Sequence, residues 1–287
     1  MFHGFRDEMI GLPEATLRVR HGGSGPPVLL LHGHPRTHAT WHRVAPILAD
    51  HHTVVCPDLR GFGRSTIPED TRDHRGSSKR AKARDCVSLM SRLGFERFAV
   101  VGHDRGSYTA FRAAMDHPAA VSHLAILDGV PILEALERCD ARFATAWWHW
   151  FFFAQPEKPE RAITADPLAW YGGSAEQMGD EAYAEYRAAI RDPRVIHGMI
   201  EDYRAGLSMD RHHDAEDRAA GRRLACPALV LWSLRDDLQD IYGDVLEVWK
   251  PWVAGALSGK GLDCGHHMAE EAPDQLAAEI LAFLRSQ

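Results

Sequence analysis

The chain has 287 residues, of which 45% are hydrophobic and 25% charged, a balance typical of a folded protein rather than a disordered, collagen-like or coiled-coil chain. Its formal net charge of −7, from 40 acidic and 33 basic side chains, disfavours a nucleic-acid-binding surface and favours small molecules as partners. Five scattered cysteines without a C-x-x-C spacing predict neither a disulfide framework nor a zinc ribbon, and a reducing cytoplasm fits them best.

The sequence contains no segment typical of a targeting or membrane-spanning element. Residues 1–18 include charged side chains and no apolar core, so we predict no secretory signal. No window reaches the roughly 18 uncharged apolar residues that a bilayer span requires. We therefore expect a cytoplasmic protein with no membrane partner.

Short apolar runs bounded by turn residues recur along the chain, and each predicts a strand buried on both faces. They cover residues 28–31, 53–56, 98–101, 123–127 and 228–232. Helix-length segments alternate with these runs, at residues 77–93, 108–115 and 272–284. The alternation predicts an α/β fold in which a mostly parallel sheet is flanked by helices.

One long segment interrupts this alternation. Residues 133–221 have helical spacing and no strand-like run, which predicts a helical cap inserted between two strands of the sheet. The family resemblance described below implies that the strand before this cap is the sixth of the fold. The α/β core then comprises residues 1–132 and 222–287. Within the cap, the aromatic run at residues 146–154 predicts the wall of a buried pocket.

The strand predicted at residues 98–101 leads into Gly102-His103-Asp104-Arg105-Gly106 and then into a helix. Small residues on both sides of a central side chain are typical of a nucleophile elbow, with Asp104 where serine hydrolases carry serine. The glycines permit a tight turn that presents this side chain at the strand end, where a carboxylate can attack carbon. The alternative is that Asp104 caps the N-terminus of the following helix.

Two further segments support a catalytic site. The first strand ends in His32-Gly33-His34, where the backbone N–H groups of His34 and Arg105 would form an oxyanion hole. Near the C-terminus, His266 follows the last predicted strand, at the place of the catalytic base. Nucleophile, acid and histidine then occur in the chain order expected of this kind of hydrolase.

These motifs resemble those of the α/β-hydrolase superfamily, and specifically of the haloacetate (fluoroacetate) dehalogenases. The resemblance spans almost the whole chain, and its cap motifs discriminate best because many hydrolases share the core motifs. The matching segments are His32-Gly33, Pro35, Thr37-His38, Trp41 to Val44, Asp58-Leu59, Gly61, Gly63, Ser65, Gly102 to Gly106, Leu127-Asp128, His149-Trp150, Ala154 to Pro156, Glu201 to Gly206, Gly265-His266 and Glu270 to Pro273.

The resemblance implies hydrolysis of a short 2-haloacid, such as fluoroacetate or chloroacetate, to the 2-hydroxy acid and halide through an aspartyl ester. Asp104 would displace the halide, His266 would activate water, and Asp128 would orient His266. The implied halide-binding residues are His149, Trp150 and Tyr203, and the implied substrate-binding residues are Arg105, which would pair with the substrate carboxylate, Tyr108, His34 and Trp41. A homodimer is a further implication of the resemblance.

The sequence departs from the dehalogenase pattern three residues after Arg105, where Tyr108 stands in place of a second arginine. A phenol donates one hydrogen bond but carries no charge, so binding of a small anionic substrate should weaken. We hypothesise that a protonated His34, or the Tyr108 hydroxyl, partly replaces the missing arginine.

Several alternatives remain at this stage. Asp236, at the end of the strand at residues 228–232, is a second candidate for the triad acid, although the local sequence favours Asp128. An epoxide hydrolase would use the same aspartate and histidine, although such enzymes typically carry tryptophan where this chain has Arg105. A third alternative is a protein that binds a small acid without catalysis. No phosphate-binding loop or dinucleotide fingerprint follows a strand, so we expect no cofactor, and we predict no metal site.

Overall fold

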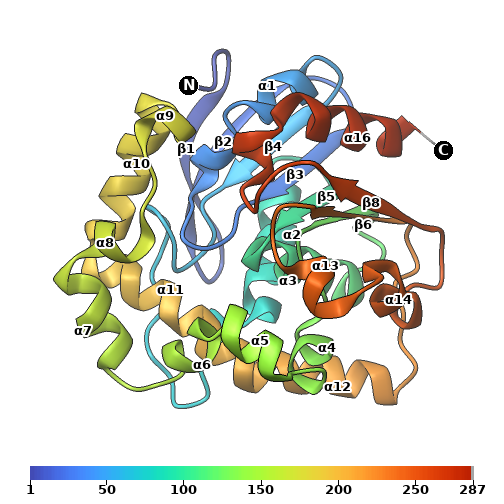
Figure 1. Ribbon diagram of the computed structural model, residues 1–287. Coiled ribbons are helices and arrows are strands. Elements are labelled where there is room, and N and C mark those ends of the chain that lie inside the picture. Colours follow the sequence, from blue (N-terminus) through green and yellow to red (C-terminus); the bar gives the residue numbers. More distant parts are fainter. Residues whose placement is uncertain (286–287) are drawn as a thin grey trace.

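The computed structural model describes residues 1–285, and its centre is a sheet of eight strands (Figure 1). The strand order is β1-β2-β4-β3-β5-β6-β7-β8; β2 pairs antiparallel with β1 and with β4, and all later pairings are parallel. The predicted α/β class with a mostly parallel sheet is therefore confirmed. The strands are Arg6–Gly11 (β1), Thr16–Gly23 (β2), Pro27–Leu31 (β3), Thr53–Pro57 (β4), Phe98–His103 (β5), Val121–Leu127 (β6), Ala228–Ser233 (β7) and Leu257–Leu262 (β8).

Helices cover both faces of this sheet (Figure 1). Along β3, Val28 and Leu30 point into the core shared with α1 and α16, whereas Leu29 and Leu31 point into the core shared with α2 and α3. A strand buried on both faces explains the continuous apolar run in its sequence. These helices are Val44–Ala49 (α1), Lys79–Arg92 (α2), Arg105–Asp116 (α3) and Pro273–Arg285 (α16).

The chain between β6 and β7 is helical and lies at the left and bottom of Figure 1. Its first helix begins at Ile132 and its last ends at Ala219. The elements are Ile132–Glu137 (α4), Ala141–Ala146 (α5), His149–Phe153 (α6), Lys158–Ala165 (α7), Pro167–Tyr171 (α8), Ala175–Met178 (α9), Asp180–Arg191 (α10), Pro193–Ala205 (α11), Gly206–Asp210 (η3) and Arg211–Ala219 (α12).

The remaining elements are short and lie in the connections of the core. They are His38–Trp41 (η1), Arg75–Ser77 (η2), Leu238–Tyr242 (α13), Val245–Trp249 (α14), Lys250–Trp252 (η4) and Met268–Glu271 (α15). Among residues 1–285, no helix has both the length and the apolar character needed to cross a membrane.

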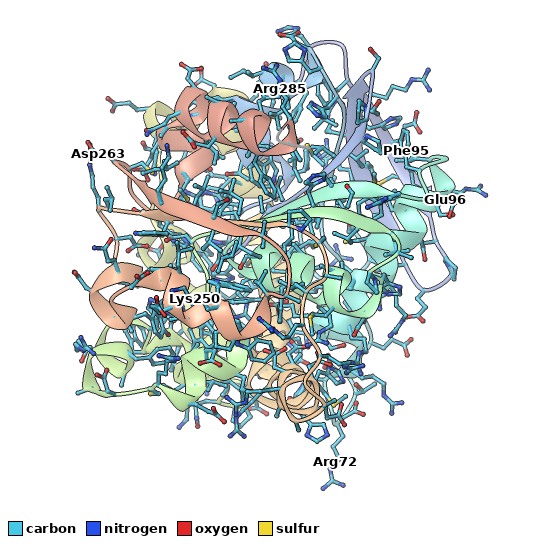
Figure 2. The ribbon with its side chains drawn as sticks, turned by 90° about the vertical axis from the view of Figure 1, so that its right-hand side faces the viewer. Arg72, Phe95, Glu96, Lys250, Asp263 and Arg285 are labelled. Carbon is cyan, nitrogen blue, oxygen red and sulfur yellow. The ribbon has the colours of Figure 1, made fainter. Side chains whose placement is uncertain are left out.

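The direction of the parallel strands determines where a site can form. In Figure 2, Phe95 and Glu96, which precede β5, lie on one side of the molecule, and Asp263, which follows β8, lies on the other. The carboxyl ends of the parallel strands therefore share one edge of the sheet. Ligands of open α/β sheets bind beyond this edge. The loops after β5, β6, β7 and β8 accordingly meet there.

Candidate active site

Asp104 occupies the sharp turn between β5 and α3. Its φ of 50° lies in the left-handed region, a strained conformation for a residue with a side chain. The turn packs so closely on β3 that a Cβ on Gly106 would overlap the carbonyl groups of Leu31 and His32. The Asp104 side chain makes no capping hydrogen bond to α3, so the helix-cap alternative is wrong.

The Asp104 carboxylate is held by backbone donors. Its Oδ1 accepts a 2.6 Å hydrogen bond from the N–H of His34, and a Cβ on Gly33 would overlap the carboxylate. Burial acts to raise the pKa of Asp104, but His266 and other positive groups nearby, together with the Arg105 N–H, hold that pKa below its ordinary value. The Asp104 carboxylate is therefore ionised at neutral pH, and its Oδ1 lies at the His34 N–H, one of the two backbone donors predicted for an oxyanion hole.

His266 lies among three carboxylates. Its Nδ1 is 2.7 Å from Oδ2 of Asp128 and 3.0 Å from Oδ2 of Asp236, and its Nε2 is 3.9 Å from Oδ2 of Asp104. Burial opposes protonation, yet the hydrogen bonds to Asp128 and Asp236 raise the pKa of His266 well above its ordinary value. The resting site therefore contains an imidazolium.

The two candidates for the triad acid both reach His266, but they differ in burial. The Asp128 side chain is 2% exposed, and its other oxygen accepts a 3.2 Å hydrogen bond from the Ser233 N–H. The Asp236 side chain is 32% exposed. Asp128 therefore has the fixed, desolvated geometry of an orienting group, and Asp236 adds a second, more solvated charge.

A cavity of about 490 Å³ opens beside these groups, and aromatic side chains of the cap form much of its wall. Trp147 stacks on Trp150 with ring centroids 5.4 Å apart. The prediction that residues 146–154 form a pocket wall is confirmed. The lining residues are His34, Pro35, Asp104, Tyr108, Asp128, Ala146, Trp147, Trp148, His149, Trp150, Phe153, Ala169, Trp170, Tyr171, Tyr203, Asp236, Asp237, Leu238, His266 and His267.

The three predicted halide-binding residues lie together on this wall. The ring of Tyr203 is 5.6 Å from that of His149 and 6.0 Å from that of Trp150, measured between centroids. Burial lowers the pKa of His149 to about 4 and raises the pKa of Tyr203. At neutral pH the cluster therefore offers N–H and O–H donors without a formal charge.

His34 and Tyr108 also line the cavity, but neither supplies a charge. Burial lowers the pKa of His34 to about 3, even though the Asp104 carboxylate lies nearby. The hypothesis that a protonated His34 replaces the second arginine is therefore wrong, because desolvation keeps this ring neutral. The Tyr108 hydroxyl remains as the other candidate.

Arg105 does not line the cavity. Its Nε donates to Oδ2 of Asp202 at 2.5 Å, and its Nη2 donates to the Asp202 carbonyl at 2.9 Å. The guanidinium carbon lies 4.0 Å from the ring centroid of Tyr203 and 5.1 Å from those of Tyr108 and Trp150. These three rings line the cavity, so Arg105 lies behind the wall.

Trp41, a predicted substrate-binding residue, and His103, which precedes Asp104 in its motif, both have structural contacts. Trp41 does not reach the cavity; it is fully buried in the core shared with α1 and α16. The ring of His103 lies with Nε2 2.7 Å from the carbonyl oxygen of His266 and supports that loop. The motif match placed Trp41 near the site, but only the packing of η1 shows on which side its ring lies.

The sequence analysis missed several wall residues, of which Asp237 has the clearest chemistry. Its Oδ1 accepts a 2.8 Å hydrogen bond from Trp147 Nε1, and burial raises its pKa to about 6. Tyr171 also lies on the wall, 5.1 Å from the ring of His34. Neither residue belongs to a motif, so no local signal in the sequence could identify them.

The fold and this arrangement define an α/β hydrolase. The family model for the alpha/beta hydrolase fold matches residues 26–273, and the chain belongs to that family. It is 42% identical to a fluoroacetate dehalogenase from Burkholderia sp. over 99% of this chain and 95% of the relative, which confirms the resemblance noted in the sequence. It is 32% identical to a soluble epoxide hydrolase from Corynebacterium sp. (strain C12) over 91% of both chains.

Solved structures agree with this relationship. A Nostoc sp. PCC 7120 protein described as an α/β hydrolase superposes with a TM-score of 0.95 at 41% identity, covering 100% of both chains. A Pseudomonas aeruginosa protein described as an epoxide hydrolase superposes with a TM-score of 0.90 at 44% identity, covering 99% of this chain and 96% of that one. The relatives therefore include both dehalogenase and epoxide hydrolase names.

Proposed function

We propose that this hydrolase cleaves a carbon–halogen bond next to a carbonyl group through an alkyl ester on Asp104. Oδ2 of Asp104 attacks the halogen-bearing carbon, and the halide leaves with the bonding electron pair. His266 then takes a proton from a water molecule that adds to the ester carbon of Asp104. Collapse breaks the bond between that carbon and Oδ2; the departing alkoxide takes the proton from His266, and the second water proton passes to solvent.

The observation that carries this proposal is the different environment of the two Asp104 oxygens. Oδ1 is held by the His34 N–H at 2.6 Å, while Oδ2 faces His266 Nε2 at 3.9 Å. Once an ester forms on Oδ2, Oδ1 is the carbonyl oxygen and already lies at the donors that stabilise negative charge on water addition. The 3.9 Å separation is too long for a direct hydrogen bond, which suits a base that acts on an intervening water.

The departing halide requires hydrogen-bond donors, and the cluster of His149, Trp150 and Tyr203 provides them. Charge-assisted hydrogen bonds to an anion are stronger than those between neutral groups. The 42% identity to a protein named fluoroacetate dehalogenase supports a short 2-haloacid, such as fluoroacetate or chloroacetate, as the substrate. The products would then be the 2-hydroxy acid and halide.

An oxygen-18 experiment tests the ester. In a single turnover with excess enzyme and chloroacetate in labelled water, we expect the label in the peptide that contains Asp104, because water attacks the aspartyl carbon. The His266→Gln variant should accumulate the ester, seen as a mass increase on the same peptide. Halide release without label in Asp104 would instead mean direct attack of water on the substrate. The Asp104→Asn variant is the inactive control.

Epoxide hydrolysis is the second candidate, and the two tyrosines of the wall favour it. Tyr171 and Tyr203 both contact the ring of His34, with centroids 5.1 and 5.2 Å away. The Tyr171 hydroxyl is buried without a hydrogen-bond partner among the described residues. Two phenols can donate to an epoxide oxygen as Asp104 opens the ring. Diol formation from styrene oxide without halide release from chloroacetate would select this candidate.

A further inference from the structure

A second cluster of potential ligands lies outside the active site, where the loop between β4 and α2 meets the cap helix α11 (Figure 1). Asp70 on this loop, and His197 and Glu201 on α11, each offer one ligand atom, and the three atoms lie within 4.8 Å of one another. His197 and Glu201 are four residues apart, so they lie one turn apart on the same face of the helix. The loop and the helix therefore bring one imidazole and two carboxylates together.

The imidazole of His197 is held in the orientation that a metal ligand requires. Its Nδ1 is 3.1 Å from Oε1 of Glu160 on α7, and its Nε2 is 2.8 Å from Oδ1 of Asp70. A histidine that binds a metal ion through one ring nitrogen commonly donates its other N–H to a carboxylate, which fixes the ring and makes it a better ligand. Glu160 is placed as that supporting carboxylate, so Nε2 is the nitrogen left for an ion.

The Glu201 carboxylate is fixed as well. Its Oε1 accepts a 2.8 Å hydrogen bond from Nη1 of Arg204, and its Oε2 is 2.7 Å from Nδ1 of His74. The Glu201 side chain is 8% exposed, whereas that of Asp70 is 66% exposed. With metal–ligand bonds of about 2.0–2.2 Å, ligand atoms on one tetrahedral ion lie about 3.3–3.6 Å apart. A small movement of the exposed Asp70 therefore completes the geometry.

A cavity of about 650 Å³ opens beside this cluster, and His74, Glu160, His197 and Arg204 are among the residues that line it. The cavity provides an entry path and room for water at the remaining coordination positions. The hydrogen bonds to Glu160 and Asp70 raise the pKa of His197 to about 9, so an ion at Nε2 replaces one proton at neutral pH. A divalent ion and Arg204 together then balance the three carboxylates of the cluster.

We propose that Asp70, His197 and Glu201 bind a divalent transition-metal ion such as Zn²⁺, with Glu160 supporting His197. An imidazole together with carboxylates suits Zn²⁺ and similar ions, whereas Mg²⁺ and Ca²⁺ prefer oxygen ligands alone. The ion ties the core loop to α11, the helix that also carries Tyr203. The site is independent of the proposed reaction. It departs from the expectation of no metal site because its ligands lie as far as 127 residues apart in the sequence, where no local spacing connects them.

Calorimetric titration of the enzyme with Zn²⁺ tests this site. We expect saturable binding that excess Mg²⁺ does not displace. The affinity should fall at least tenfold in His197→Gln, which removes a ligand, and about 10- to 100-fold in Glu160→Gln, which removes the carboxylate that supports it. His212→Gln is the matched control, because His212 is exposed and lies 3.1 Å from Glu216 one turn along α12; the affinity should not change. No binding of Zn²⁺, or equal affinity in wild type, His197→Gln and Glu160→Gln, overturns the proposal.

The described residues contain one other group that could hold a metal ion, namely His103, Asp128 and His266 of the active site. The His266→Gln variant separates the two, and we expect its affinity for Zn²⁺ to match that of the wild type; loss of all Zn²⁺ binding in this variant overturns the proposal. Anomalous diffraction from zinc-soaked crystals of the wild type needs no variant. A zinc peak at His197 Nε2 supports the proposal, and zinc bound only at other residues overturns it.

Discussion

The two carboxylates at His266 Nδ1 lead to a prediction about which of them orients the base. Asp128 is almost fully buried, lies 2.7 Å from Nδ1 and is fixed by the Ser233 N–H, so Asp128→Asn should disturb both the tautomer and the orientation of the ring. In a serine hydrolase triad the equivalent change costs about 10⁴-fold in kcat. We expect a loss of about 10³- to 10⁴-fold in ester hydrolysis.

Asp236 should contribute mainly charge. Asp236 lies 3.0 Å from His266, and at this distance the Coulomb energy between unit charges is about 1.4 kcal/mol in a water-like dielectric. We use the water-like value because the Asp236 side chain is about one-third exposed. Asp236→Asn should therefore cost about tenfold in the same step. The assay is rapid-quench mass spectrometry of the Asp104 ester beside steady-state halide release. An active Asp128→Asn variant together with an inactive Asp236→Asn variant would refute this reasoning and make Asp236 the triad acid.

Three further predictions follow from contacts at and behind the wall. Tyr203→Phe keeps the ring but removes a hydrogen-bond donor to the leaving halide, and such a bond is worth about 1.5–3 kcal/mol. Fluoride release should therefore fall roughly tenfold or more, and bromide release should fall less. Equal losses for the two halides would exclude a role of Tyr203 in stabilising the leaving halide. Asp202→Asn leaves three buried cations without their shared carboxylate and should lower the free energy of unfolding by about 3–5 kcal/mol in urea denaturation, and a change below about 1 kcal/mol would contradict it. The hydrogen bonds of Asp128 and Asp236 raise the pKa of His266, so kcat should fall as the pH drops through that pKa. Asp236→Asn removes one of these hydrogen bonds and should move the fall in kcat to lower pH. A pH profile of kcat that stays in place or moves to higher pH would contradict the influence of Asp236 on the His266 pKa.

The parts of the site that the sequence predicts well are those encoded in short segments. Asp104 lies between glycines that the turn requires, and the strand before it is apolar because it is buried on both faces. Strands β1, β2 and β8 were not predicted. β1 and β8 expose many of their side chains, and arginines interrupt β2, so none of the three has the apolar run that identifies a buried strand.

The sequence does not predict which residues form hydrogen bonds and ion pairs with the predicted site residues. Arg105 is next to the nucleophile in sequence, yet its contacts are with Asp202, on a helix 97 residues further along the chain. A motif places a guanidinium near the site but does not say which carboxylate it meets. The same limit applies to Asp236, whose distance from His266 depends on how β7 and β8 pair rather than on any local pattern.

The charges at the site suit the two chemical steps in their order. In the resting state the ionised Asp104 and the protonated His266 stabilise each other, and the first step needs only the carboxylate. Alkylation of Asp104 removes its negative charge, which is one of the charges that raise the pKa of His266. The imidazole therefore loses its proton more readily once the ester is present, when a base is required to activate water. Asp128 and Asp236 keep the His266 ring basic enough to take a proton from water. Asp236 therefore influences the second step through the pKa of His266, while the first step depends on the charge of Asp104.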